Sequence, residues 1–147
     1  IGGTKVGAMI GEAVVFTGMK APKYFFSIVK RHGALLAKGR MLGIQFDTLF
    51  TDNLYLKVSQ HAINMAVRIC DIFRKHGIAI AYDSPTNQQF VVLPQKLYEA
   101  LLQKVAFEIW ERKSDEEIIC RFVTSWATKE EELDELDRIL TTLCGAC

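Results

Sequence analysis

The sequence has no marked excess of charge of either sign. Its 147 residues carry 18 lysines and arginines against 17 aspartates and glutamates, which gives a formal net charge of +1 at pH 7. Proteins that bind nucleic acids or membrane surfaces usually concentrate positive charge on one face. The near balance therefore predicts no nucleic-acid or membrane partner, and it favours a small molecule or another protein.

Long hydrophobic runs are also missing. No apolar stretch reaches the roughly 18 to 20 residues that a membrane-spanning helix needs. The first residues lack the charged, apolar and cleavage regions of a signal peptide. We therefore expect a protein of the cytoplasm.

Cysteines are too few and too scattered for the disulfide framework of a secreted domain. Two of them, Cys144 and Cys147, form a C-x-x-C pair at the end of the chain. A zinc site would need two more ligands at similar spacing, and a redox pair is expected where a helix begins. We therefore predict ordinary thiols and no bound metal.

The residues that are present have the profile of a folded globular protein, since 50% are hydrophobic and 24% are charged. The chain opens with Lys5 between Gly3 and Gly7. Glycine allows positive φ angles and close approach of the backbone to another group. This segment can therefore hold a lysine in a fixed direction.

The first third of the chain predicts one strand and two helices. A strand is expected at residues 12–16, and helices are expected at 24–32 and 34–50. A single strand is not stable with both edges exposed. We therefore expect it to belong to a larger sheet whose other strands lie upstream.

Residues 53–147 predict a small α+β domain. A long helix ends at Gly77, and its apolar stripe consists of Val58, Ala62, Met65, Ala66, Ile69, Ile72 and Phe73. Strands are expected at 78–82, 89–93, 107–111 and 118–124, with helices at 95–104 and after a capping box of Thr128 and Glu131. The closing helix has an apolar face of Leu133, Leu136, Ile139, Leu140 and Leu143. The pattern predicts about four strands covered by helices on one face.

Four blocks of sequence, in the order 2–13, 31–39, 42–46 and 121–128, resemble the threonine aldolase and aromatic amino acid β-eliminating lyase family. The resemblance implies an α/β protein: the C-terminal part of a fold-type I enzyme that depends on pyridoxal 5'-phosphate. Residues 1–20 would then end the large cofactor-binding domain, 21–52 would be linking helices, and 53–147 would form the small domain.

The resemblance also implies roles for individual residues. Lys5 matches the lysine that binds the cofactor aldehyde, Thr4 would lie beside the cofactor, and Lys38 would reach the phosphate of a neighbouring subunit's cofactor. Solvent exposure at the chain end explains Lys5 without a function. A solvated basic surface explains Lys38 as well as its neighbours Lys30, Arg31 and Arg40.

Arg121 matches the arginine that holds the substrate α-carboxylate in this family. Strand alternation places it on one face with Ile119 and Val123, where a guanidinium is costly unless an anion meets it. Its planar fork suits a carboxylate. An ion pair with a nearby glutamate is the alternative.

The implied reaction of the intact protein is the retro-aldol cleavage of a β-hydroxy amino acid, such as threonine, to glycine and an aldehyde. The family's histidines and its aspartate are not found in this sequence, so the fragment alone is predicted to be inactive. The parent would be a homodimer or homotetramer acting on a small amino acid. The alternatives are β-elimination from an aromatic or sulfur-containing amino acid, and a non-catalytic module that pairs subunits.

Overall fold

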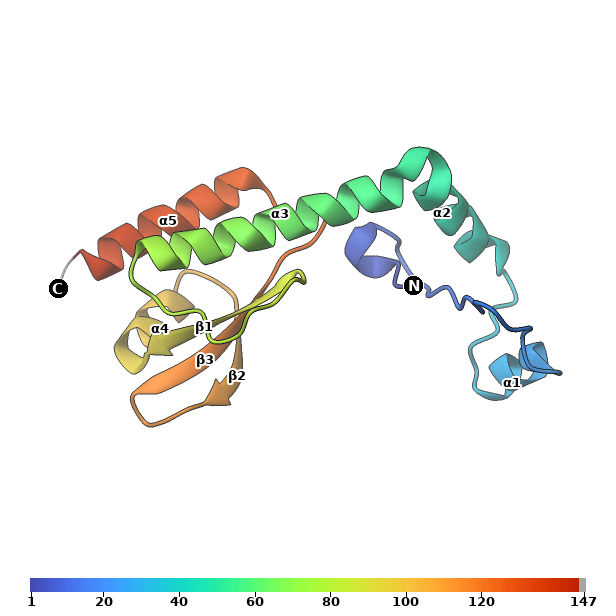
Figure 1. The fold of residues 1–147 in the computed structure, drawn as a ribbon, viewed down its shortest axis with the longest axis horizontal. Helices are drawn as coiled ribbons and strands as arrows, with labels where there is room; N and C mark the ends of the chain where they lie inside the picture. The colour runs from blue at the N-terminus through green and yellow to red at the C-terminus, as the bar shows by residue number, and fades with distance from the viewer. Residues whose placement is uncertain (146–147) are drawn as a thin grey trace. The chain divides into compact units, whose positions relative to one another are not determined.

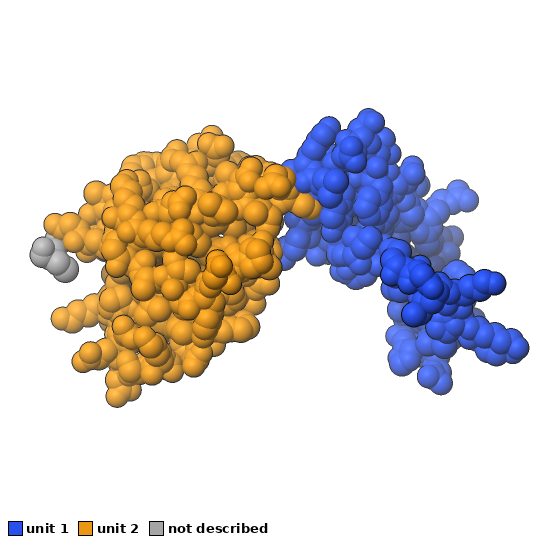
Figure 2. Space-filling view, viewed as in Figure 1, with its two compact units in different colours: residues 1–58 blue, residues 59–147 orange. Residues whose placement is uncertain are grey.

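The computed structural model describes residues 1–145 of the chain and divides it into two compact units, Ile1–Val58 and Ser59–Cys147 (Figures 1 and 2). Each unit has its own apolar cluster of buried side chains. Among residues 1–145, no helix is both long enough and apolar enough to cross a membrane.

The first unit consists of short helices. They are the 3-10 turn η1 (Thr4–Val6), α1 (Phe25–Arg31), α2 (Arg40–Phe50), the 3-10 turn η2 (Thr51–Asn53) and the first residues of α3 (Leu54–Lys75). Its small core contains Val6, Ala8 and Leu49, against which Tyr55 and Val58 pack. The end of η1 is therefore fastened to α2 and to the start of α3.

The strand expected at residues 12–16 is not formed. Glu12 makes a single antiparallel bridge with Gly2, and the next four residues have no regular structure. Within the described residues of this unit no second strand lies beside this segment, so its backbone groups have no ladder to join. The prediction was wrong because a short apolar run forms a strand only where another strand pairs with it.

The helix expected at 34–50 begins only at Arg40. Gly33, with φ of 70°, ends the preceding helical turn, and Gly39 is the N-cap of α2. Leu35 and Leu36, counted toward the helical pattern, lie in the connection and are 45% and 44% exposed. Glycine weakens helices, and the residues between the two glycines form no helix.

Asp52 and Asn53 separate α2 from α3 by their backbone conformation. Their φ angles are 51° and 57°, in the left-handed region where aspartate and asparagine occur more often than other non-glycine residues. This left-handed backbone, and not a continuous helix, is what separates α2 from α3.

The second unit is built on an antiparallel sheet with the strand order β1-β3-β2. Its strands are β1 (Gln88–Pro94), β2 (Glu108–Arg112) and β3 (Glu117–Val123). The fourth expected strand, at 78–82, is reduced to a bridge between Ile80 and Val91. Gly77 and Pro85 bracket this short segment, which leaves room for only two backbone hydrogen bonds to β1, at 2.8 and 2.9 Å.

Helices α3 and α5 (Glu130–Cys144) run side by side over one face of the sheet, and α4 (Gln95–Leu102) connects β1 to the segment before β2 (Figure 1). The predicted mixed fold with helices on one face is confirmed. Of the stripe predicted for α3, every member except Val58 is buried. Leu133, Leu136 and Leu140 of α5 are buried against the same core.

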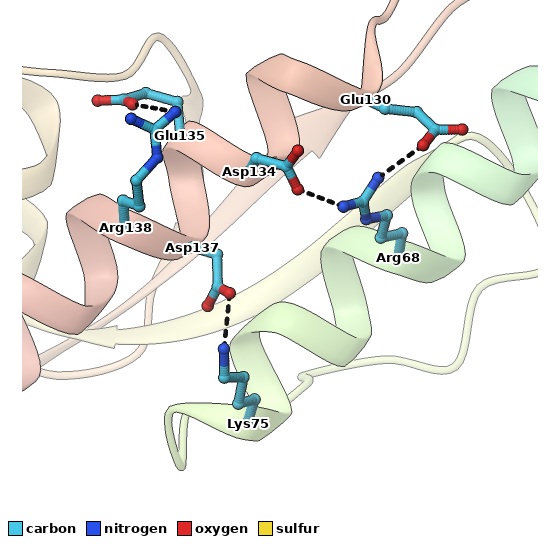
Figure 3. Close-up of polar contacts among 7 residues, drawn as sticks. All are labelled: Arg68, Lys75, Glu130, Asp134, Glu135, Asp137 and Arg138. Carbon is cyan, nitrogen blue, oxygen red and sulfur yellow. Dashed lines mark hydrogen bonds and ion pairs between the residues drawn. The ribbon is translucent and has the colours of Figure 1, made fainter.

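Ion pairs join α3 to α5 along their exposed edges (Figure 3). Arg68 binds Glu130 at 3.3 Å and also binds Asp134, while Lys75 Nζ lies 2.6 Å from Asp137. His76 adds a contact of 2.7 Å between Nε2 and the same Asp137 carboxylate. The hydrogen bond from Lys75, and then that from His76, lowers the pKa of Asp137 below its ordinary value.

The helix cap before α5 lies one residue later than predicted. The hydroxyl of Thr128 accepts a hydrogen bond from the Ser125 amide at 3.0 Å. The Lys129 amide donates instead to the Glu132 carboxylate at 2.9 Å. The expected pairing of Thr128 with Glu131 is therefore wrong, because the Thr128 hydroxyl is already used by the turn.

Two cysteines are buried in the second unit. The Cys70 thiol donates to Gln89 Oε1 at 3.1 Å, and Cys120 has no exposed surface. Burial raises the pKa of Cys70, and it raises that of Cys120 to about 11. Of the C-x-x-C pair, Cys147 lies outside the described residues. Among residues 1–145, no group of three or more potential ligands is placed to hold a metal ion.

Candidate functional site

The segment around Lys5 is shaped by glycine. Gly3 is buried, and a Cβ atom at that position would lie 2.8 Å from the Ala8 Cβ and 3.0 Å from the Gly11 carbonyl oxygen. Gly7 ends η1 with φ of 98°, which disfavours residues with a side chain. The sequence therefore makes a tight turn here, with Lys5 at its centre.

Contacts from α2 and α3 fix this turn in place. The Met9 amide donates to Gln45 Oε1 at 2.7 Å, and the Tyr55 hydroxyl donates to the Gly2 carbonyl at 3.1 Å. Within the turn, the amides of Val6 and Ala8 both donate to the Gly3 carbonyl, at 3.2 and 3.0 Å. Lys5 is thus a flexible side chain on a backbone that is held from several directions.

The Lys5 side chain lies at the surface of the first unit. Lys5 and Thr4 are exposed, and among residues 1–145 neither side chain has a hydrogen-bond or ion-pair partner. An amine with no internal partner, next to a free hydroxyl on a fixed turn, fits a cofactor that carries an aldehyde and a phosphate. The donor set thus agrees with the cofactor that the resemblance implies.

Lys38 lies in the turn directly before α2. Its carbonyl accepts the Met41 amide at 3.0 Å, and its side chain is exposed. Lys30 and Arg31 lie in the last turn of α1, and Arg40 is the first residue of α2. All four side chains are exposed, so this basic region offers several cations to an anion.

Arg121 belongs to the second unit, where it lies in β3 between Phe90 of β1 and Glu108 of β2. Its Nη1 donates to Gln88 Oε1 at 3.0 Å, and its Nη2 makes an ion pair with Glu108. The guanidinium also lies over the Trp110 ring, 5.5 Å from the centroid. The glutamate partner that the sequence left open as an alternative is therefore present.

One donor of Arg121 has no partner. Its Nε atom is buried and makes no hydrogen bond within the described part of the chain. A buried donor without an acceptor is costly, and guanidinium groups bind carboxylates well because two donors act together. The Arg121 guanidinium thus keeps one donor that no residue of the described part of the chain satisfies.

Three aromatic residues beside Arg121 were missed by sequence reasoning. The Trp110 ring packs edge-on against the Phe90 ring, with 5.0 Å between the ring centroids. The Phe90 ring packs in the same way against the Tyr82 ring, with 5.6 Å between the centroids. The Tyr82 hydroxyl donates to Glu111 Oε2 at 3.1 Å, which raises the pKa of Tyr82. Trp110 is the extra residue of a β-bulge between Ile109 and Glu111, and simple alternation cannot reveal a bulge.

The structure places Thr4, Lys5 and Lys38 in the first unit, and Arg121 in the second. Thr4 and Lys5 are neighbours in η1, and Lys38 approaches α2, on which η1 packs. Arg121 has its own surroundings of strand residues.

Comparison with known proteins gives three informative matches. The chain is 27% identical to a low specificity L-threonine aldolase of Pseudomonas aeruginosa over 147 residues, which is 99% of this chain and 41% of that protein. It is 28% identical to the low specificity L-threonine aldolase of another Pseudomonas strain over 137 residues, 92% of this chain and 38% of that protein. The chain thus spans about two fifths of the length of the curated relatives it matches.

The fold matches as well. A solved structure of threonine aldolase from Leishmania major superposes with a TM-score of 0.78 and 34% sequence identity, over 82% of this chain and 35% of that one. No family model matches the chain. The resemblance expected from the sequence is confirmed: the chain is similar, in sequence and in fold, to a C-terminal part of threonine aldolase.

Proposed function

We propose that the intact protein is a pyridoxal 5'-phosphate-dependent lyase that cleaves a β-hydroxy amino acid, such as threonine, to glycine and an aldehyde. The observation that carries the proposal is Lys5, which is unpaired and exposed on a glycine-shaped turn, in a chain that matches threonine aldolases along nearly its whole length. The cofactor, when bound, supplies a ring that accepts electrons from the bond that breaks.

In this proposal Lys5 would hold the cofactor aldehyde through its side-chain amine, which the substrate amine would replace. The task needs a primary amine with no competing ion pair, because an ammonium held by a carboxylate loses its proton less readily. Thr4 lies next to the cofactor, and Lys38 contributes positive charge toward a phosphate. The free amine and hydroxyl in η1 support these assignments.

Arg121 binds the substrate carboxylate in this proposal and so orients the bond to be cleaved. The exposed position of its partner Glu108, which can leave the guanidinium, supports this role. Orientation of this kind contributes to catalysis by holding the reacting groups in one geometry. Residues 1–20, 21–52 and 53–147 are then the end of a large domain, linking helices and a small domain.

The first unit supports a parent protein with further parts. Met9, Phe26 and Met19 are 86%, 73% and 70% exposed, and such apolar surface is usually covered in a complete protein. We infer that the parent is a homodimer or homotetramer of the cytoplasm, and that residues 1–147 alone do not catalyse the reaction.

The test is reductive trapping of the cofactor followed by peptide mapping. The intact protein is incubated with pyridoxal 5'-phosphate, reduced with borohydride and digested, and we expect the modified peptide to contain Lys5. A Lys5→Ala variant should lose this peptide, the visible absorbance of the bound cofactor and glycine release from threonine. Lys57→Ala, a change of another exposed lysine in the first unit, is the matched control. Trapping elsewhere with full activity of Lys5→Ala, or release of pyruvate in place of glycine, would contradict the proposal.

A further inference from the structure

We propose that Glu108 competes with the substrate for Arg121. In the free protein the Glu108 carboxylate occupies the guanidinium, and the substrate carboxylate must displace it. The inference rests on the proposed function, in which Arg121 holds that carboxylate. Glu108 and Arg121 are direct cross-strand partners in the β2–β3 register, and the Glu108 carboxylate makes an ion pair with Nη2. A ligand that takes two hydrogen bonds from the fork therefore meets Glu108 first.

The two partners differ in how freely they can move. The Glu108 side chain is 67% exposed, whereas the Arg121 side chain is 27% exposed. Glu108 lies on β2, an edge strand whose five residues are all exposed, and it can turn into water without leaving a buried charge. Exchange of one exposed carboxylate for another costs little, because such ion pairs contribute little to stability.

Other contacts keep Arg121 in position when Glu108 leaves. Gln88 Oε1 accepts from Nη1 at 3.0 Å, and the Trp110 ring lies under the guanidinium at 5.5 Å. The β-bulge at Trp110 re-aims that side chain, which also packs against Phe90. A planar cation over an indole face retains its attraction whichever carboxylate it binds. The Arg121 side chain therefore keeps its position when the Glu108 carboxylate leaves.

Glu111 provides a matched control within the same strand. It is also exposed and also hydrogen-bonded, but its partner is the Tyr82 hydroxyl, at 3.1 Å. Neutralising Glu111 removes the same charge from β2 and leaves the pair of Glu108 and Arg121 intact. A difference between Glu108→Gln and Glu111→Gln therefore reports competition at the guanidinium and not the general loss of a negative charge.

The first measurement is steady-state kinetics of the intact enzyme with threonine. We expect Glu108→Gln to lower KM by roughly two- to fivefold, as fits the loss of one exposed ion pair, with kcat little changed. Glu111→Gln should leave both constants near those of the unchanged protein. Arg121→Gln should raise KM strongly or abolish activity.

The second measurement needs no activity. Acetate is titrated into the 147-residue chain while the side-chain Nε–H signal of Arg121 is followed by NMR. We expect the Arg121 signal of Glu108→Gln to shift at roughly two- to fivefold lower acetate concentration than that of the unchanged chain. The Glu111→Gln variant should respond at the same acetate concentration as the unchanged chain.

The outcomes separate the two proposals. If Arg121→Gln keeps full activity, the proposed carboxylate role is wrong. If Arg121→Gln is inactive and Glu108→Gln has an unchanged or higher KM and an unchanged acetate response, only the competition is wrong. The competition is also wrong if Glu111→Gln and Glu108→Gln are both folded and change KM and the acetate response to the same extent.

Discussion

Gly3→Ala is expected to loosen the turn that carries Lys5, by a purely steric effect. The φ angle of Gly3 is −107°, which alanine adopts without strain. The added Cβ would lie 2.8 Å from the Ala8 Cβ, 3.0 Å from the Gly11 carbonyl oxygen and 3.2 Å from the Phe46 ring. Two of these neighbours are backbone or Cβ atoms that cannot move alone, so the turn itself must shift.

The cost of forcing a methyl group into such a packed position is about 1 to 3 kcal/mol. Gly43→Ala is the matched control, because a Cβ there has no atom within 4 Å and the residue lies inside α2. Alanine in place of glycine in a helix interior is expected to stabilise by about 0.5 to 1 kcal/mol. The change from glycine to alanine should therefore lower the stability of the fold at position 3 and raise it at position 43.

Native-state hydrogen exchange at Ala8 measures this effect locally. The Ala8 amide donates to the Gly3 carbonyl at 3.0 Å and is exposed to exchange only when the turn opens. We expect Gly3→Ala to speed its exchange about 5- to 150-fold, the factor that corresponds to the steric cost. Gly43→Ala should leave that rate unchanged or slower. Equal exchange rates for Gly3→Ala and the unchanged chain would refute the idea that the glycine is required for close packing.

Two further experiments test the second unit, one by a substitution at Asp137 and one by chemical labelling of Cys120. Because Lys75 and His76 lower the pKa of Asp137, the ionised carboxylate stabilises the fold above its ordinary pKa of 3.8, and this contribution is lost as the pH falls below that value. Urea unfolding should therefore show Asp137→Asn to be less stable than the unchanged chain at pH 6, with the difference shrinking toward pH 2; a pH-independent difference would contradict this. The buried Cys120 thiol, with its pKa raised to about 11, should be alkylated by iodoacetamide at pH 8 far more slowly in the folded chain than in urea, as peptide mass spectrometry can measure. Equally fast labelling in both states would show that the thiol is not buried.

Periodicity predicted best those elements that pack against a partner within the same unit. The stripe of α3 repeats over many residues, and it forms because α5 and the sheet supply the matching surface. The segment at 12–16 has an equally acceptable local pattern and forms no strand, since strand formation depends on a partner strand. The apolar face of a helix could thus be recognised from its own residues, whereas a strand also requires a partner strand.

The candidate site was predictable in part for a similar reason. The glycines around Lys5 mark a special backbone in the sequence itself, and strand alternation placed Arg121 on a face with Ile119. The partners of Arg121 were not predictable, because they depend on register and on the bulge at Trp110. A one-residue shift in β2 would present different side chains to the guanidinium.

The bulge in β2 also bears on how the protein avoids association through its sheet. β2 is an edge strand, and a regular edge offers free backbone groups to the edge of any other sheet. Here the extra residue interrupts the regular spacing of those groups, and Glu108, Glu111 and Arg112 place charges along the strand. The irregularity that turns an indole toward an arginine thus also makes this edge a poor template for another strand, so that two copies of the sheet are not expected to join there.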